Sequence, residues 1–345
     1  MSVWKLIKLN FGRSPAHFGE LGIGLEETSE RVRSDTLFSA WLSAYSRLLE
    51  KAATEELLEK FDSQSEPPFR LSSTFIYQQV HGETVYYLPR PRKFPPNYPI
   101  GKDLDFAKDY KKHNYLPLEM WQRWYQSEQG FSENDLLELS DQVAYSNAFQ
   151  IEKVPKIAVD RVTRATNLYH TGVVQFRSSQ NGNDVESLSG LYFLIQFPDQ
   201  NPTLENDFLA VLNFLGGEGI GGERSSGAGQ FKVEALAELP QLWSDVVKFS
   251  GGNYHSLISL FWQHPLAQEL LENSSYELQE RGGWITSPAS GRQLRRKSVQ
   301  MFAEGSVFPV QPQGKLADVT PQPFKDHNIY RSGISLSLPI KVQGE

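Results

Sequence analysis

Hydrophobic positions along the chain form short segments that predict a mixture of strands and helices. The alternation of Val3–Asn10 predicts a first strand, and an apolar stripe at helical spacing predicts a helix over Asp35–Lys51 with Ser34 as its N-cap. A second helix is expected over Asn206–Leu215, where apolar residues recur at the same spacing. The other expected strands are Phe69–Tyr77, Thr84–Leu88, parts of Gln150–Val174, Leu191–Phe197 and a strand beginning at Gln230.

The order of these elements is β-α-β-β-α-β with insertions, which is the ferredoxin-like plan of an α+β fold. We therefore expect an N-terminal ferredoxin-like domain over residues 1–240. A proline-rich and basic segment predicts a surface insertion at about 89–150, and a hairpin thumb is expected at about 151–177. Residues 241–345 are long enough for a second, smaller unit. Its strand candidates are Ser256–Trp262, Val299–Phe308 and Gly333–Ile340.

Between the second expected helix and the following strand lies a glycine-rich loop, Gly216–Phe231, which reads GGEGIGGERSSGAGQF. Glycine is used this densely where the backbone takes positive φ or approaches another group closely. Amide hydrogens, the hydroxyls of Ser225 and Ser226 and the guanidinium of Arg224 together suit a phosphate. The order helix–loop–strand excludes a dinucleotide fingerprint, which follows a strand and opens a helix. The alternative is a helix C-cap followed by a wide turn.

Composition narrows the class of protein. The chain of 345 residues has no cysteine, which excludes disulfides and thiolate metal sites and suits a cytoplasmic protein. Neither a signal peptide nor a membrane-spanning segment is expected. The net charge of −7 argues against a protein that coats nucleic acid over its whole surface. Neither a metal nor a cofactor is expected.

Positive charge is nevertheless concentrated in two runs. Lys153–Arg177 contains five cations and one acid, and Arg281–Lys297 contains five cations and no acid. This segregation predicts one face for a polyanion and another for basic protein partners. Chance clustering on solvated surfaces is the alternative.

Several short motifs, in a fixed order over residues 17–308, resemble one family. They are His17–Gly19, Ser34–Ala40, Pro155–Arg161 continuing to Ala165–Tyr169, Gly221–Gly229, and Arg296–Phe302 followed by Gly305. Together they resemble the RAMP superfamily of CRISPR-associated proteins, and within it the fourth Csm subunit of type III-A effector complexes. The Cmr counterpart of type III-B complexes shares much of this pattern.

The resemblance implies two ferredoxin-like (RRM-like) units and no nuclease activity in this subunit. It implies a role in antiviral defence at the base of a ribonucleoprotein. There the chain would bind the 5′ handle of the CRISPR RNA and anchor the large polymerase-like subunit. Its neighbour along the RNA would be the repeating backbone RAMP subunit.

The residues expected to contact RNA share the chemistry that single-stranded RNA requires, namely cations, amides, hydroxyls and stacking surfaces. In the hairpin, cations would follow phosphates, polar side chains would read bases or sugars, and Tyr169 would stack or else pack in the core. Ser34 and Thr36 would offer a helix N-terminus to phosphate, or Ser34 would simply cap the helix. The basic run that ends at Lys297 would hold RNA or an acidic partner surface. The full set is His17, Ser34, Thr36, Lys153, Lys156, Arg161, Arg164, Thr166, Asn167, Tyr169, Gly221, Gly222, Arg224, Ser225, Ser226, Arg292, Arg295, Arg296 and Lys297.

Two other functions stay open at this point. The chain could be a metal-independent endoribonuclease that processes repeat RNA, with His17 as the best candidate base, although no second group is spaced to protonate the leaving oxygen. It could also be a protein-interaction scaffold that never contacts RNA.

Overall fold

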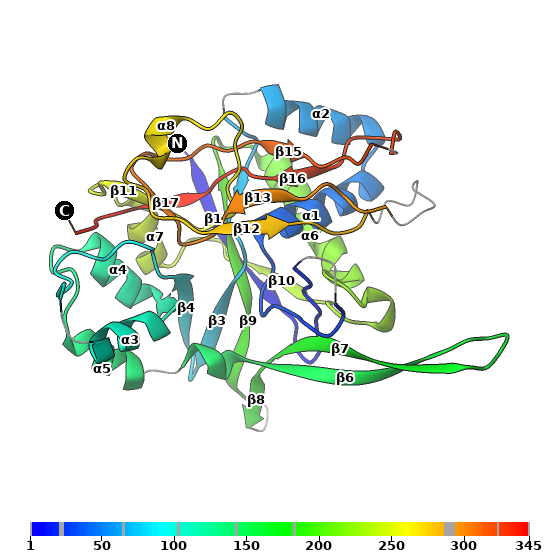
Figure 1. Ribbon diagram of the computed structural model, residues 1–345, viewed down its shortest axis with the longest axis horizontal. Coiled ribbons are helices and arrows are strands. Elements are labelled where there is room, and N and C mark those ends of the chain that lie inside the picture. Colours follow the sequence, from blue (N-terminus) through cyan, green and yellow to red (C-terminus); the bar gives the residue numbers. More distant parts are fainter. Residues whose placement is uncertain are drawn as a thin grey trace.

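The computed structural model describes residues 2–20, 24–63, 66–101, 104–141, 144–181, 184–285, 294–322 and 324–343. Its centre is an antiparallel sheet with the strand order β10-β1-β9-β3-β4-β5, and β2 and β8 also pair with β9 (Figure 1). The strands of this sheet are β1 (Val3–Asn10), β2 (Arg70–Leu71), β3 (Phe75–Val80), β4 (Glu83–Pro89), β5 (Tyr115–Pro117), β8 (Ser178–Asn181), β9 (Asp184–Phe197) and β10 (Lys232–Ala235).

Helices and smaller sheets surround this centre. The helices are α1 (Ser34–Leu48), α2 (Lys51–Ser63), α3 (Leu104–Lys112), α4 (Leu118–Gln126), α5 (Asn134–Asp141), α6 (Pro202–Glu218), α7 (Gln241–Lys248) and α8 (Gln268–Leu271), with 3-10 turns η1 (Tyr145–Ala148) and η2 (Arg224–Ser226). The remaining strands are β6 (Phe149–Val159), β7 (Thr166–Phe176), β11 (Tyr254–Leu257), β12 (Leu278–Arg281), β13 (Val299–Phe302), β14 (Val307–Phe308), β15 (Leu316–Asp318), β16 (Tyr330–Ser332) and β17 (Ser337–Ile340). They form the sheets β14-β11-β17, β12-β13, β15-β16 and β6-β7.

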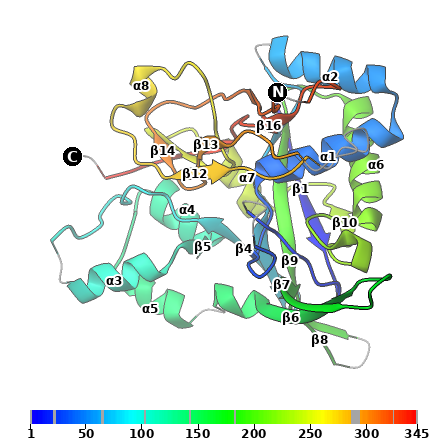
Figure 2. The same cartoon turned by 45° about the vertical axis from the view of Figure 1, so that its right-hand side comes forward.

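Both faces of the central sheet are buried, because successive side chains of a strand point to opposite faces. Ile7 and Leu9 of β1 lie in a core shared with α1 and α6, where the Trp41 and Phe208 rings stack at 5.0 Å. Leu6 lies in a second core, which is closed by α4, α7 and β17. Figure 2 shows α1 and α6 on one side of the sheet and α4 on the other.

The α+β class with antiparallel sheets is confirmed, but two expectations about single elements were wrong. The first helix ends at Leu48, because Leu49 is extended, and a separate helix, α2, begins at Lys51. The 89–150 segment does not simply lie on the surface. Trp121 and Trp124 of α4 are fully buried in the second core, since α4 turns one apolar face to the sheet.

The second core joins both sides of the predicted boundary near residue 240. Tyr192 of the central sheet shares it with Ile258, Leu336 and Leu338 of the C-terminal part. The boundary itself stays a prediction. Within the described ranges, no helix combines the length and the apolar character needed to cross a bilayer.

Candidate nucleic-acid interface

The most exposed part of the described chain is the β6-β7 hairpin, which projects from the body as an arm (Figure 1). Its strands pair without interruption from Phe149↔Phe176 to Val159↔Thr166. Asp160 closes the tip, because its carboxylate accepts from the amides of Val162 and Thr163 at 2.8 and 2.7 Å. We call residues 149–176 the hairpin arm.

The two faces of the hairpin arm differ in chemistry, because residues paired across the strands share a face. One face carries the pairs Lys156↔Tyr169 and Ala158↔Asn167. The other carries Ile157 and Leu168, whose side chains are 63% and 62% exposed. We call the face of Lys156, Asn167 and Tyr169 the polar face. The opposite face combines Ile157 and Leu168 with Lys153, Thr166 and His170. Lys153, Arg161, Arg164 and Thr166 are also exposed on the arm.

The base of the arm is fixed to the loop that follows β1. Ala16 and Val174 form an antiparallel bridge, and the amide of Gly172 donates to the carbonyl of Leu25 at 2.7 Å. His17 is buried, and its Nδ1 lies 2.7 Å from the carbonyl oxygen of Gly172. His17 thus holds the arm in place, which the sequence pattern did not indicate.

The glycine-rich loop lies between α6 and β10 and packs against the same segment. A Cβ atom at Gly221, where φ is +97°, would stand 2.3 Å from the carbonyl oxygen of His17. One at Gly222 would stand 2.7 Å from the His17 ring. The amide of Gly222 donates to that same carbonyl of His17 at 2.9 Å. Close packing within the protein therefore accounts for these two glycines.

The polar end of this loop meets the polar face of the hairpin arm. The Lys156 amine forms an ion pair with Glu223 and lies 3.3 Å from the hydroxyl of Ser226. The hydrogen bond from Lys156 lowers the pKa of Glu223. Arg224 and Ser225 are exposed beside this contact. Sequence reasoning placed Lys156, Arg224 and Ser226 in the site and missed Glu223, the acid that neutralises Lys156.

The N-terminus of α1 is closed against the C-terminal part of the chain. Arg33, and not Ser34, is the N-cap residue, so the capping prediction was wrong. Ser34 is buried, and its hydroxyl accepts from the amide of Leu260 at 2.9 Å. The hydroxyl of Thr36 accepts from Arg281 at 3.0 Å. Both hydroxyls are used inside the protein.

The second basic run is divided by the fold. Arg281 is buried and donates to both oxygens of Asp35, at 3.0 and 3.1 Å. Arg295 and Lys297 are exposed, whereas Arg296 is largely covered. Arg292 lies outside the described residues.

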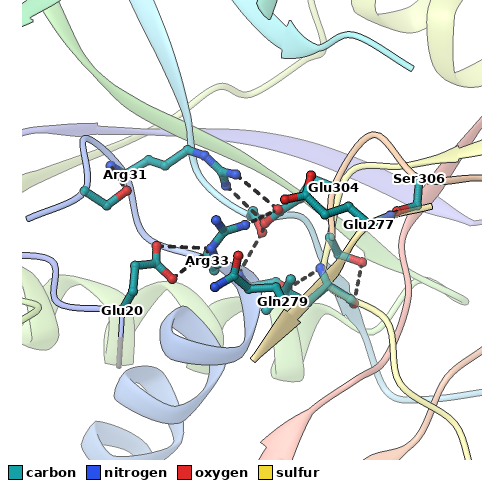
Figure 3. A network of polar contacts seen from close by, with 12 residues as sticks. Glu20, Arg31, Arg33, Glu277, Gln279, Glu304 and Ser306 are labelled. Atoms are coloured by element: carbon teal, nitrogen blue, oxygen red, sulfur yellow. Dashed lines mark hydrogen bonds and ion pairs between the residues drawn. The ribbon is translucent and has the colours of Figure 1, made fainter. Parts of the chain in front are cut away.

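A second polar network, which sequence reasoning missed, joins the segment before α1 to the turn after β13 (Figure 3). Glu304 is buried and receives two hydrogen bonds from Arg31, at 3.0 and 3.1 Å, while Arg33 donates to Glu304 and Glu20. Burial alone raises the pKa of Glu304, but Arg31 and Arg33 outweigh it and hold that pKa well below its usual range. No local sequence pattern connects residues so far apart in the chain.

Beside this network lies a cleft of about 340 Å³, lined among others by Arg31, Arg33, Arg92, Glu277 and Glu304. Of the four arginines that line it, Arg92 pairs with Glu277, Arg31 and Arg33 bind Glu304, and Arg90 donates to the carbonyl of His113. Among the residues that the structure describes, no group of three or more acidic or histidine side chains is arranged to hold a metal ion.

Comparison with known proteins shows which families and structures this chain is similar to. The family model of the CRISPR Csm4 C-terminal domain matches residues 250–340. The CRISPR system Cms protein Csm4 of Thermococcus onnurineus is 27% identical over 319 residues, which cover 90% of this chain and 92% of the relative. The protein of the same name from Streptococcus thermophilus is 25% identical over 313 residues, with 90% of each chain covered.

The C-terminal part of the chain matches the Csm4 family model, and the chain as a whole is similar to Csm4 proteins. The similarity to Csm4 proteins runs through nearly the whole length, so it includes the hairpin arm, the glycine-rich loop and the C-terminal domain. The resemblance inferred from short motifs is thereby confirmed.

A solved structure shares the fold of this chain. It is a chain of the crystal structure of a Csm3-Csm4 subcomplex in the type III-A CRISPR-Cas interference complex. The two match with a TM-score of 0.59 and 20% identity, covering 97% of this chain and 99% of the other. The segment matched by the Csm4 C-terminal domain model, residues 250–340, contains Arg281, Arg296, Glu304 and Arg331.

Proposed function

We propose that this chain is a non-catalytic subunit of a type III-A CRISPR ribonucleoprotein effector that binds the 5′ handle of the CRISPR RNA. It also anchors the large polymerase-like subunit at the base of the complex and adjoins the repeating backbone RAMP subunit. Similarity to Csm4 proteins and to a Csm3-Csm4 structure supports the setting.

One observation carries the RNA-binding part of the proposal. Lys156 on the polar face of the hairpin arm contacts the glycine-rich loop beside the exposed Arg224 and Ser225, and Asn167 and Tyr169 lie on the same face of the arm. Cations, hydroxyls and an aromatic ring are the groups that bind a single strand through its phosphates, sugars and bases.

We further propose that the N-terminal region is a ferredoxin-like unit. Strands β1, β3, β9 and β10 stand in the order β10-β1-β9-β3, with α1 following β1 and α6 preceding β10. The smaller ferredoxin-like unit expected at 241–345 rests on the family resemblance, since the described strands there form sheets of two or three.

The proposal that the chain does not cut RNA is supported by the surroundings of His17. A general base must come within hydrogen-bond reach of the proton that it abstracts. His17 is only 5% exposed, and its Nδ1 already contacts a backbone carbonyl. Cleavage of repeat RNA in EDTA by the purified chain, lost in His17→Ala, would overturn this part.

The direct test removes the charge at the tip of the arm. In Arg161→Gln/Arg164→Gln, we expect weaker RNA binding and a salt slope reduced by about 1.4, since each phosphate contact with single-stranded RNA contributes about 0.7. Lys51→Gln/Lys60→Gln on α2 is the matched control, because it removes two exposed charges away from the arm.

Sequencing of the copurified RNA identifies the ligand, and repeat-derived 5′ ends are expected. Equal RNA retention and equal salt slopes in the two double variants would contradict the proposal. Valine at Gly221 or Gly222 is no substitute for this test, because it would also disturb packing against His17.

A further inference from the structure

Three arginines of the C-terminal domain gather at the N-terminus of α1, where two of them are paired. Arg281 and Arg331 are buried, and both donate to the carboxylate of Asp35. Arg281 also pairs with Glu20, and Arg331 donates to the carbonyl of Gly282. These two guanidiniums therefore have acidic partners.

The third, Arg296, has none among the described residues. A Cβ atom at Gly283 would stand 3.0 Å from Nη2 of Arg296 and 3.7 Å from Nη2 of Arg331, so both guanidiniums border the same glycine. Within the described ranges the Arg296 side chain forms no ion pair, and its buried Nε has no hydrogen-bond partner. The Nε of Arg331 is likewise buried without an acceptor.

The charges around Arg296 do not compensate it. Burial, and then the neighbouring Arg331, lower the pKa of Arg296 to about 10, so it remains charged at neutral pH. Asp35, the acid whose charge acts on Arg296, already binds two other arginines. A largely covered cation without a partner destabilises the fold. An anion from outside the chain would remove that destabilisation.

We propose that Arg296 forms an anion site that takes a phosphate group of the bound single-stranded RNA. This inference rests on the proposed function and adds a contact point far along the sequence from the hairpin arm. Arg331, which is buried and donates to Asp35 and Gly282, adds positive charge behind the site without contacting the phosphate itself.

The surroundings favour RNA over an acidic side chain of a partner protein. Arg295 and Lys297 flank Arg296, both are exposed, and neither has an ion-pair partner within the part of the chain that the structure describes. Trp284 forms a bridge with Arg295 and is 44% exposed. An aromatic ring next to several cations suits a chain of phosphates that carries bases.

The test compares Arg296→Met, which keeps a similar volume without the charge, with the matched control Arg295→Met on the exposed neighbour. The probe is the RNA that copurifies with the wild-type full chain, synthesised with a fluorescent label. We expect Arg296→Met to lose about tenfold or more in affinity, and Arg295→Met about two- to threefold. Without RNA, Arg296→Met should unfold at the same temperature as the wild type or a higher one, because it removes an uncompensated buried charge.

If the methionine variant fails to fold, Arg296→Lys is a second variant that tests the same site. It retains the charge but loses the planar fork, so we expect an intermediate loss of affinity. Unchanged RNA affinity in these Arg296 variants overturns the site. If affinity is unchanged but assembly with the backbone subunit is lost, the occupant is a carboxylate of the partner, which also overturns our assignment. A wild-type chain that binds no RNA overturns the proposed function itself.

Discussion

The hairpin arm and the N-terminus of α1 contain cations that look alike in the sequence and differ completely in the fold. On the arm, Arg161 and Arg164 are exposed at the tip. At α1, Arg281 is buried against Asp35, a residue 246 positions away in the chain. The comparison teaches that a basic run can offer its cations to RNA only where the fold leaves them exposed instead of burying them against acids from elsewhere in the chain.

The difference between the two regions is also energetic. Exposed cations contribute little to stability and remain available for a ligand. Buried cations and their carboxylates stabilise the fold only as complete pairs, because a lone buried charge is costly. We therefore expect substitutions on the arm to change binding and substitutions in the buried networks to change stability.

The largest effect should come from Glu304→Ala. It leaves Arg31 buried without its carboxylate, and we expect a loss of about 3–5 kcal/mol in the free energy of unfolding. Urea unfolding measures it, and Arg161→Ala on the arm tip is the control, for which we expect a change within about 0.5 kcal/mol. Equal losses of stability in the two variants would contradict the claim that the buried network, and not the arm, stabilises the fold.

Lowering the pH tests the same difference between the hairpin arm and the buried ion pairs. In the folded chain, arginine partners outweigh burial and hold the pKa of both Glu304 and Asp35 below their ordinary values of 4.5 and 3.8. The unfolded chain therefore takes up protons first as the pH falls, so stability present at neutral pH is lost progressively below about pH 5.

The free energy of unfolding, measured with urea between pH 7 and about pH 3, should fall as the pH is lowered. In a Glu304→Gln variant this fall should be smaller. Asp160, on the arm, serves as the comparison. Hydrogen bonds from Thr163 and Val162 also lower its pKa, but its carboxylate is fully exposed, so we expect Asp160→Asn to reduce this fall less. An Asp160→Asn variant with the same reduction would contradict the assignment of this fall in stability to the buried pairs.

The smallest expected effect concerns Glu223, an acid at the proposed RNA surface. Glu223→Gln releases Lys156 and removes a carboxylate beside the glycine-rich loop. We expect RNA affinity to rise about two- to fivefold at low salt, with the gain shrinking as salt screens it. Glu55→Gln on α2 makes the same charge change elsewhere and should leave affinity unchanged. A loss of affinity in Glu223→Gln would show that the ion pair organises the site.

Much of the architecture could be predicted from the sequence, because local patterns determine it. The alternation of Val3–Asn10 and the apolar stripe after Ser34 correspond to β1 and α1. The burial of α4 could not be predicted in this way, since its apolar face gives no sign of which surface covers it. The pairing of Arg31 with Glu304 spans 273 positions, and no local pattern reports a contact of that kind.

The candidate site was predictable to a similar degree. Residue types and motif order led to the arm and to the glycine-rich loop. They did not show that Gly221 packs on the carbonyl of His17, or that Ser34 and Thr36 are used by Leu260 and Arg281. These are tertiary contacts, and only the fold brings their partners together.

The most direct test of the account is protein–RNA crosslinking in the assembled complex, with the label at the 5′ end of the copurified RNA. We expect crosslinks to the polar face of the hairpin arm, at Asn167 and Tyr169, and to the loop around Arg224. Crosslinks confined to other parts of the chain, with the arm and the loop unmodified, would contradict it.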